Sequence, residues 1–232
     1  MDLSPTLPAS SLDASSLAPD LYPEVCEPLE EVGAARPADA SAALAFALSR
    51  LASDDPRPWV MATTPVWLRE RGRPFARGLA RMGAAPERLI WIRAHKEAEA
   101  LWALEEALKS GAVAGGLVTA EQPAFVMTRR LDFAARAGGA RGLVLRAGPA
   151  LDLSAARMRW RIAAGPSAPA PYDEAAPGAP RLVAELVRRR SGPPGIWELE
   201  QDDETGGFRV VAGLADHGLD AAGRRRGETT AA

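Results

Sequence analysis

The chain has 232 residues, of which 47% are hydrophobic and 25% are charged, so it can form one sizeable core and has the composition of an ordinary soluble globular protein. Its net charge of −2 argues against bulk attraction to nucleic acid, while one cysteine and two distant histidines leave no ligand set for a structural metal. The sequence also lacks the roughly 20 consecutive apolar residues of a membrane helix and the pattern of a secretory signal, which predicts a cytoplasmic protein.

Apolar periodicity predicts strands that alternate with helices through the first two thirds of the chain. In chain order we expect a strand over 24–29, a helix over 39–51 capped by Asp39 or Ser41, a strand over 59–63, an interrupted helical segment over 65–82, a strand over 89–92, a helix over 95–109, a strand over 112–120, a helix over 124–137 and a strand over 142–146. The run 112–120 is uncharged, as expected of a strand buried on both faces. This alternation indicates crossover connections and a mostly parallel sheet.

The pattern changes after Ser154. Met158, Trp160 and Ile162 alternate with arginines, which predicts a half-exposed strand of the antiparallel type. Further along the chain we expect a Pro/Ala/Gly loop over 164–180, strands over 182–187 and 196–200, a turn over 203–207 and a strand over 208–211. The predicted fold is therefore α/β, with a mostly parallel sheet flanked by helices and with antiparallel strands at its C-terminal end.

Composition divides the chain into three regions. Residues 1–20 are rich in Ser, Pro, Ala and Asp and are predicted to form a disordered leader. Residues 21–215 are predicted to form the domain. Residues 216–232 are small, polar and basic, and are predicted to form a mobile tail.

A parallel core followed by antiparallel strands resembles the core of RecA-like ATPases. The resemblance covers about Trp59 to Val211. Within it, the segment 154–162 (SAARMRWRI) is similar to the RecA strand that follows the second DNA-binding loop. The segment 185–195 (ELVRRRSGPPG) is similar to the Lys-Asn-Arg-x-Gly-Pro-Thr-Gly strand and turn of RecA, RadA and DnaB-type proteins.

Two segments resemble the ImuA family more closely. Residues 99–111 (EALWALEEALKSG) are similar to the helix of that family, and residues 186–197 (LVRRRSGPPGIW) are similar to its C-terminal hallmark. ImuA proteins are RecA-like accessory proteins of damage-induced mutagenesis in the SOS response. The resemblance implies a role in translesion DNA synthesis, together with an error-prone polymerase and with ImuB, an inactive relative of the Y-family polymerases.

The resemblance also implies that the protein is cytoplasmic, associates with the nucleoid when DNA is damaged, and has RecA as a further candidate partner. Two alternatives remain open. The first is a DNA-stimulated ATPase or recombinase relative, and the second is a cell-division inhibitor of the SulA type. Capture of a Y-family polymerase relative, or of the tubulin-like division protein, would separate an ImuA role from a SulA role.

The segment where a phosphate-binding loop belongs, 30–42 (EEVGAARPADASA), has one glycine and no lysine, whereas the motif needs two glycines followed by Lys and a hydroxyl residue. The predicted central strand ends at Thr119, where a Mg²⁺-holding acid belongs. Glu97 and Glu99 lie where a general base is expected, but the helix dipole also favours acids there. We therefore expect no catalytic residue, no metal, no cofactor and no enzymatic activity.

Neither DNA-binding loop of RecA has room in this chain, which predicts weak or no direct DNA binding. The candidate partner interface instead combines Arg188 and Arg190, on one face of a predicted strand, with Trp197 across a tight turn. The arginines of the tail extend this surface: Arg224, Arg225 and Arg226. The alternative interpretation is a solvated basic edge and a solubilising tail, with partner docking on the outward face of the helix over 124–137.

Overall fold

The computed structural model describes residues 22–82, 84–149, 153–170, 172–190, 192–202 and 204–214. Its helices are α1 (Ala40–Leu51), α2 (Pro65–Arg71), α3 (Ala76–Arg81), α4 (Glu97–Lys109) and α5 (Phe125–Ala137). Its strands are β1 (Leu29–Ala34), β2 (Trp59–Thr63), β3 (Leu89–Arg93), β4 (Gly115–Thr119), β5 (Arg141–Arg146), β6 (Met158–Ala164), β7 (Pro169–Ala170), β8 (Asp173–Pro177), β9 (Arg181–Arg189), β10 (Gly195–Gln201) and β11 (Phe208–Leu214).

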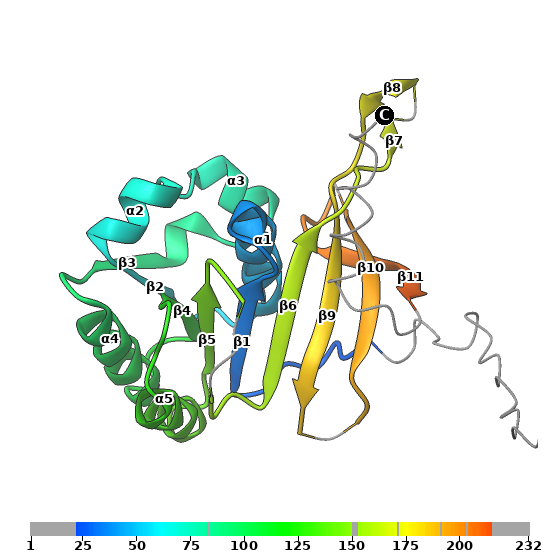
Figure 1. The fold of residues 1–232 in the computed structure, drawn as a ribbon. Helices are drawn as coiled ribbons and strands as arrows, with labels where there is room; N and C mark the ends of the chain where they lie inside the picture. Colours follow the sequence, from blue (N-terminus) through cyan, green and yellow to red (C-terminus); the bar gives the residue numbers. More distant parts are fainter. Residues whose placement is uncertain are drawn as a thin grey trace, which may run out of the picture.

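One nine-stranded sheet runs through the domain in the order β11-β10-β9-β6-β1-β5-β4-β2-β3 (Figure 1). The strands from β6 to β3 in this order are parallel to their neighbours, whereas β9, β10 and β11 join them in antiparallel pairs. The β7–β8 hairpin extends away from the sheet (Figure 1). The predicted layout, a mostly parallel core followed by antiparallel strands, is confirmed.

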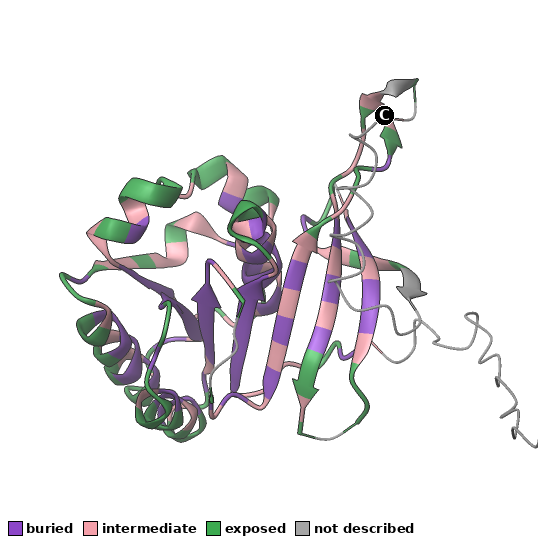
Figure 2. Cartoon of the chain, in the orientation of Figure 1, coloured by how far each residue is buried: buried purple, intermediate pink, exposed green. Residues whose placement is uncertain are grey.

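Two hydrophobic cores cover the two faces of the sheet. On one face, Phe46 and Leu48 of α1 pack with Trp160 of β6 and with β10. On the other face, Leu104 and Leu108 of α4 pack with α5 and with the central strands. The strands β1, β2 and β4 are buried along their whole length, whereas β6 and β9 alternate between buried and partly exposed residues over most of their length, and β10 also has partly exposed residues (Figure 2). This difference shows that the helices on the second face stop short of the antiparallel strands.

The first strand does not lie over 24–29 as predicted; β1 begins at Leu29. The reason is that the segment before it is used differently. The carbonyl oxygens of Pro23 and Val25 accept hydrogen bonds from the guanidinium group of Arg50 on α1, at 2.7 and 3.3 Å. The segment is therefore a strap across the end of α1, and the strand that follows carries the two glutamates Glu30 and Glu31 into the sheet.

Two further expectations need correction. β6 has the predicted alternation of buried and arginine positions, but it pairs in parallel with β1 on one side and antiparallel with β9 on the other. The strand is half-exposed because of its place in the sheet, beyond the helices of one face. The predicted loop over 164–180 also contains the short β7–β8 hairpin.

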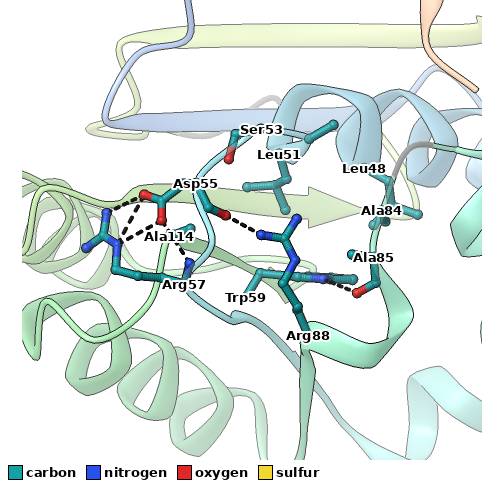
Figure 3. A pocket seen from close by; sticks show the side chains of 11 residues that line it. Leu48, Leu51, Ser53, Asp55, Arg57, Trp59, Ala84, Ala85, Arg88 and Ala114 are labelled. Atoms are coloured by element: carbon teal, nitrogen blue, oxygen red, sulfur yellow. Dashed lines mark hydrogen bonds and ion pairs between the residues drawn. The ribbon is translucent and has the colours of Figure 1, made fainter. Parts of the chain in front are cut away.

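The loop between α1 and β2 closes the amino end of the sheet. As Figure 3 shows, Asp55 accepts hydrogen bonds from Arg57, and Arg88 donates to the backbone oxygen of Asp55. Trp59 Nε1 donates to the carbonyl of Ala85 at 3.0 Å. Hydrogen bonds from Arg57 hold the pKa of Asp55 at about 2, well below its ordinary value. The small cavity here, about 20 Å³, is therefore framed by groups that already satisfy one another.

The leader over 1–20 and the tail over 216–232 lie outside the described residues, so their predicted character stays a prediction. The tail includes three candidate interface residues, Arg224, Arg225 and Arg226. Within the described ranges, no helix is both long and apolar enough to cross a membrane. The same ranges contain no cluster of three metal-ligating side chains.

Candidate functional site

The carboxyl ends of β1 and β5 face the start of α1, which is where open α/β sheets bind ligands. A cavity of about 260 Å³ lies at this place. Its walls come from the turn before α1, from α1, from α2 and from the end of β5: Pro37, Ala38, Ala40, Ser41, Leu44, Trp67, Glu70, Arg71, Leu145, Arg146 and Ala147. This cavity is where the resemblance to ATPases predicts a nucleotide, so its polar groups decide whether phosphate can bind.

The turn between β1 and α1 is tied down by its own side chains. The buried carboxylate of Asp39 accepts the backbone N–H of Ala164 at 3.2 Å and pairs with Arg36 at 2.9 Å. Arg71 of α2 donates to the carbonyl oxygen of Pro37 at 3.0 Å. A phosphate-binding loop instead turns backbone N–H groups toward its ligand. Here Pro37 lacks an N–H, and the Asp39 hydrogen bond to Ala164 holds the turn against β6.

The cation at the floor of the cavity is already neutralised. Arg146, at the end of β5, is 1% exposed, and its Nε lies 2.7 Å from Oε1 of the fully buried Glu31 on β1. The two groups form an ion pair rather than a well-aligned hydrogen bond. Arg159 of β6 lies 3.4 Å from the same carboxylate oxygen. Arg146 and Arg159 are therefore both engaged with one buried carboxylate within the sheet.

Glu30 makes a second buried pair on the opposite face of β1. Its carboxylate accepts hydrogen bonds from Arg50 of α1 at 2.8 and 3.1 Å and from Trp160 Nε1 of β6 at 2.9 Å. Burial alone lowers the pKa of Arg50, but the adjacent carboxylate outweighs this and raises it above its ordinary range. Glu30 and Glu31 are thus internal partners of arginines on α1, β5 and β6.

The acids at the start of α4 serve the local backbone. Glu97 Oε2 accepts the backbone N–H of Glu121 at 2.9 Å, and Glu99 Oε2 accepts that of His95 at 3.0 Å. Thr119, at the end of β4, is buried and offers a hydroxyl where a carboxylate would hold Mg²⁺. These contacts favour the structural interpretation of both glutamates.

A second cavity, about 340 Å³, lies at the amino ends of the parallel strands, opposite the first. We call it the basic cleft. It is lined by Asp132, Ala155, Ala156, Arg157, Arg188, Arg189 and Arg190. The backbone N–H of Arg190 donates to the carbonyl of Arg157 at 3.1 Å, which joins the end of β9 to the start of β6.

The basic cleft brings together two residues that the sequence predicted and two that it did not. Arg188 and Arg190 are exposed, as a partner interface requires. Arg157 and Arg189 are partly buried beside them. The β6–β9 pairing brings Arg157 to this place, whereas Arg189 lies between Arg188 and Arg190 in the sequence. No local motif predicts the pairing of β6 with β9. The sequence does show the arginine at position 157, but its place beside Arg190 can be predicted only once that pairing is known.

Trp197 is not available as an exposed anchor, so this part of the predicted interface needs correction. Its side chain is 2% exposed and packs in the core on the α1 side of the sheet. Its ring lies 5.5 Å from Tyr22 and 6.1 Å from Trp160, centroid to centroid. The reason is that β10 turns Trp197 and Leu199 toward the same core, while its charged residues take the other face.

Aromatic side chains are exposed elsewhere, on the outer surface of α4 and α5. Trp102 of α4 is 56% exposed, and Val126 and Phe133 of α5 are similarly open. The guanidinium group of Arg129 lies over the Phe133 ring, 5.6 Å from its centroid. This face of α5 matches the alternative docking surface that the sequence indicated, with apolar and cationic groups side by side.

No family model matches the chain. Over 177 residues it is 43% identical to the protein named ImuA in Caulobacter vibrioides, in strain NA1000 / CB15N and in strain ATCC 19089 / CB 15 alike. The alignment covers 70% of this chain and 72% of that protein.

Two solved structures show a partial likeness. SulA from Pseudomonas aeruginosa is 23% identical, with 51% of this chain and 97% of that chain covered and a TM-score of 0.38. A DnaB-like replicative helicase, described with its interactions with primase, is 15% identical, with coverage of 78% and 58% and a TM-score of 0.42. Likeness at this level says nothing about function.

Proposed function

The chain belongs to the ImuA family, and from this premise we propose that it is a catalytically inactive, RecA-like adaptor in SOS-induced translesion DNA synthesis. In this role it acts with an ImuB-type inactive relative of the Y-family polymerases and with an error-prone polymerase. It works in the cytoplasm and associates with the nucleoid when DNA is damaged. RecA is a further candidate partner, and direct DNA binding is weak or absent.

The observation that carries the inactive role is the tied turn between β1 and α1. Phosphoryl transfer depends on a cradle of backbone N–H groups, a lysine and a held metal ion. In this chain Asp39 fastens the turn to β6, and the buried carboxylate of Glu31 neutralises Arg146. Each element that would bind phosphate is therefore missing or already engaged in the fold.

Isothermal titration with ATP tests this part of the proposal. We expect no saturable binding with or without Mg²⁺, and no ATP turnover above background. The variant Asp39→Ala releases the turn but supplies neither a lysine nor an acid for a metal ion. We therefore expect it to bind no ATP either. Micromolar affinity that requires Mg²⁺ in the unaltered protein would contradict an inactive role.

For this adaptor role we assign the partner interface to Arg188 and Arg190, together with three arginines of the tail: Arg224, Arg225 and Arg226. The exposure of Arg188 and Arg190 supports this assignment. Deleting residues 216–232 should weaken binding to the ImuB-type protein and leave the domain folded, because that segment has no core pattern in its sequence. Interferometry with purified proteins measures the loss, and circular dichroism checks the fold.

A pull-down from DNA-damaged cells tests the biological assignment. Recovery of the Y-family polymerase relative supports the adaptor, whereas recovery of the tubulin-like division protein in its place would indicate a SulA-type inhibitor. If the tail deletion binds like the full chain, the outward face of α5 is the next surface to alter, starting with Phe133→Ala.

A further inference from the structure

We propose that the basic cleft is a binding site for an acidic peptide segment, whose carboxylates pair with Arg188, Arg189 and Arg190. The inference deepens the proposed function, and it rests on that function only for the source of the segment, the ImuB-type partner. The chemistry of the site itself follows from the charges, contacts and shape of the cleft.

The three arginines at the end of β9 have no counter-charge among the described residues. Elsewhere on the antiparallel strands, arginines are neutralised across the sheet. Arg161 pairs with Glu185 at 2.7 Å, and Arg181 lies between Glu198 and Glu200. In contrast, no carboxylate in the described part of the chain lies within ion-pair distance of Arg188, Arg189 or Arg190. Three arginines without ion-pair partners among the described residues therefore lie together beside the basic cleft.

One carboxylate, that of Asp132, already lines the basic cleft. Asp132 of α5 lines the cleft and is held by Arg136 at 2.7 Å. Its Oδ1 also lies 3.7 Å from Nε of Arg157, and Oε2 of Glu27 lies 3.9 Å from Nη1 of the same arginine. Asp132 therefore reduces the positive charge on the α5 wall, while the β9 wall stays unneutralised. A ligand carboxylate would be attracted to that second wall.

The guanidinium group suits carboxylates because its planar fork donates two parallel hydrogen bonds to them. A volume of about 340 Å³ holds a few side chains rather than an extended polymer. Val187, next to Arg188 in the chain, and Leu153, two residues before Ala155, are exposed and available for apolar contacts near the cleft. The occupant that fits is a short peptide in which acidic and apolar residues alternate.

Single-stranded nucleic acid fits the cleft less well. Proteins that bind it combine cations with aromatic side chains on which bases stack. The residues that line the cleft include no aromatic side chain, and Trp197 is buried in the core. The net charge of −2 also provides no long-range attraction to a polyanion. The observations therefore favour an acidic peptide over a phosphate backbone.

Fluorescence anisotropy with a labelled peptide of alternating Leu and Glu tests the site directly. A peptide with Gln at each Glu position and a single-stranded oligonucleotide serve as comparison probes. We expect the acidic peptide to bind and the Gln peptide not to bind. The double variant Arg188→Glu/Arg190→Glu should weaken binding of the acidic peptide at least tenfold, because it places like charges opposite each other. The double variant Arg69→Glu/Arg73→Glu is the matched control, since it makes the same charge change at exposed positions elsewhere.

The variant Asp132→Asn gives a second readout of opposite sign. It removes the carboxylate that competes for the cleft, so the acidic peptide should bind about threefold more tightly. A residue that only supported the fold would not produce tighter binding. Failure of the wild-type protein to bind the acidic peptide, equal loss in the control variant, or tighter binding of the oligonucleotide through the same arginines would each overturn the proposal.

The same variants, tested with the purified ImuB-type protein, distinguish a failure of the peptide's assigned source from a failure of the proposed function. If wild type binds that protein and Arg188→Glu/Arg190→Glu does not, the partner is the source of the segment. If both bind it equally, the assigned source is wrong and the adaptor role stands. If wild type does not bind it, the proposed function fails, while the peptide titration still decides the chemistry of the cleft.

Discussion

At the scale of single residues, the buried carboxylate of Glu30 shows how this sequence tolerates charge in its core. Glu30 and Arg50 are 2% and 5% exposed at the side chain, and Trp160 Nε1 completes the hydrogen bonding of the carboxylate. A buried ion pair adds little net stability, but removing one partner leaves the other charge without compensation. The pair is therefore a point of sensitivity rather than a source of strength.

We expect Glu30→Ala to lower the free energy of unfolding by about 3–5 kcal/mol, because the buried guanidinium group of Arg50 loses its counter-charge. The double variant Glu30→Leu/Arg50→Met should recover most of that loss. Urea denaturation measures both, with the exposed Glu106→Ala as a control. A loss from Glu30→Ala no larger than that of the control would show that the pair is already solvated.

Tyr22 provides a test of burial by titration. Burial raises the pKa of its phenol to about 12, although the nearby Arg50 lowers it. The ordinary pKa of a tyrosine in an unfolded chain is about 10. Because the folded pKa is the higher one, this phenol contributes stability that is fully present below pH about 10 and is lost as pH rises toward about 12.

The sequence has two tyrosines, so Tyr172→Phe leaves Tyr22 as the sole phenol. In this variant, phenolate absorbance in the ultraviolet should rise with a midpoint near 12 in the folded protein, and near the ordinary value in urea. Equal midpoints in both conditions would mean that Tyr22 does not pack against Trp160 and Trp197 in solution.

At the scale of elements, α4 and α5 end close together because of one glycine. A Cβ built on Gly138 would lie 1.8 Å from the carbonyl oxygen of Leu108, so no side chain fits there. Arg57 donates to the carbonyl of Gly111 at 2.8 Å and to that of Gly139 at 3.0 Å, which ties the two helix ends to the same loop. The spacing of the two helices is thus set at their C-terminal turns.

Two glycine-to-alanine changes should have opposite signs. Gly138→Ala forces α4 and α5 apart and should cost about 3 kcal/mol of folding stability, at the upper end of overpacking effects. Gly78→Ala, in α3 with no atom within 4 Å of the added Cβ, should add about 0.5–1 kcal/mol through helix propensity. Thermal unfolding of both variants decides, and a neutral Gly138→Ala would refute the close contact.

Helices and strands whose apolar residues recur with a single clear spacing were predictable from the sequence. The strand β2 and the helices α1 and α5 lie close to where apolar spacing puts them. The strand β1 was missed because Glu30 and Glu31 look solvent-exposed. Their burial depends on Arg50 and Arg146, and the second of these comes from a distant strand. Local patterns carry no information about such partners.

The candidate site was predictable only in part, for the same reason. The exposure of Arg188 and Arg190 follows from local sequence, and both line the basic cleft. Arg157 joins them through the β6–β9 register, which depends on the whole sheet. Trp197 failed as an anchor because an alternating strand does not reveal which of its faces meets a core, and here α1 and Tyr22 cover the face that carries the ring.

At the scale of the whole molecule, the hydrophobic core on the α1 face extends from strands near one edge of the sheet to strands near the other edge. The cluster on the α1 face includes Trp59 of β2, near one edge, and Trp197 of β10, near the other. We expect the domain to unfold in a single cooperative transition, because the parallel and antiparallel strands share these contacts. Tryptophan fluorescence and far-ultraviolet circular dichroism should give coincident urea curves. Two separated transitions would mean that β9 to β11 unfold independently.

The position of β1 has a consequence for synthesis on the ribosome. β1 is the first strand of the sheet to be made, yet its neighbours are β5 and β6, and Glu30 receives its Trp160 hydrogen bond from 130 residues further along the chain. The nascent strand therefore has no neighbour in the sheet through most of translation, because β5 and β6 are synthesised later. Charged residues protect such a waiting strand from association with other chains. We therefore expect the two glutamates, which are buried in the finished sheet, to keep its first strand hydrated until its partners have been synthesised.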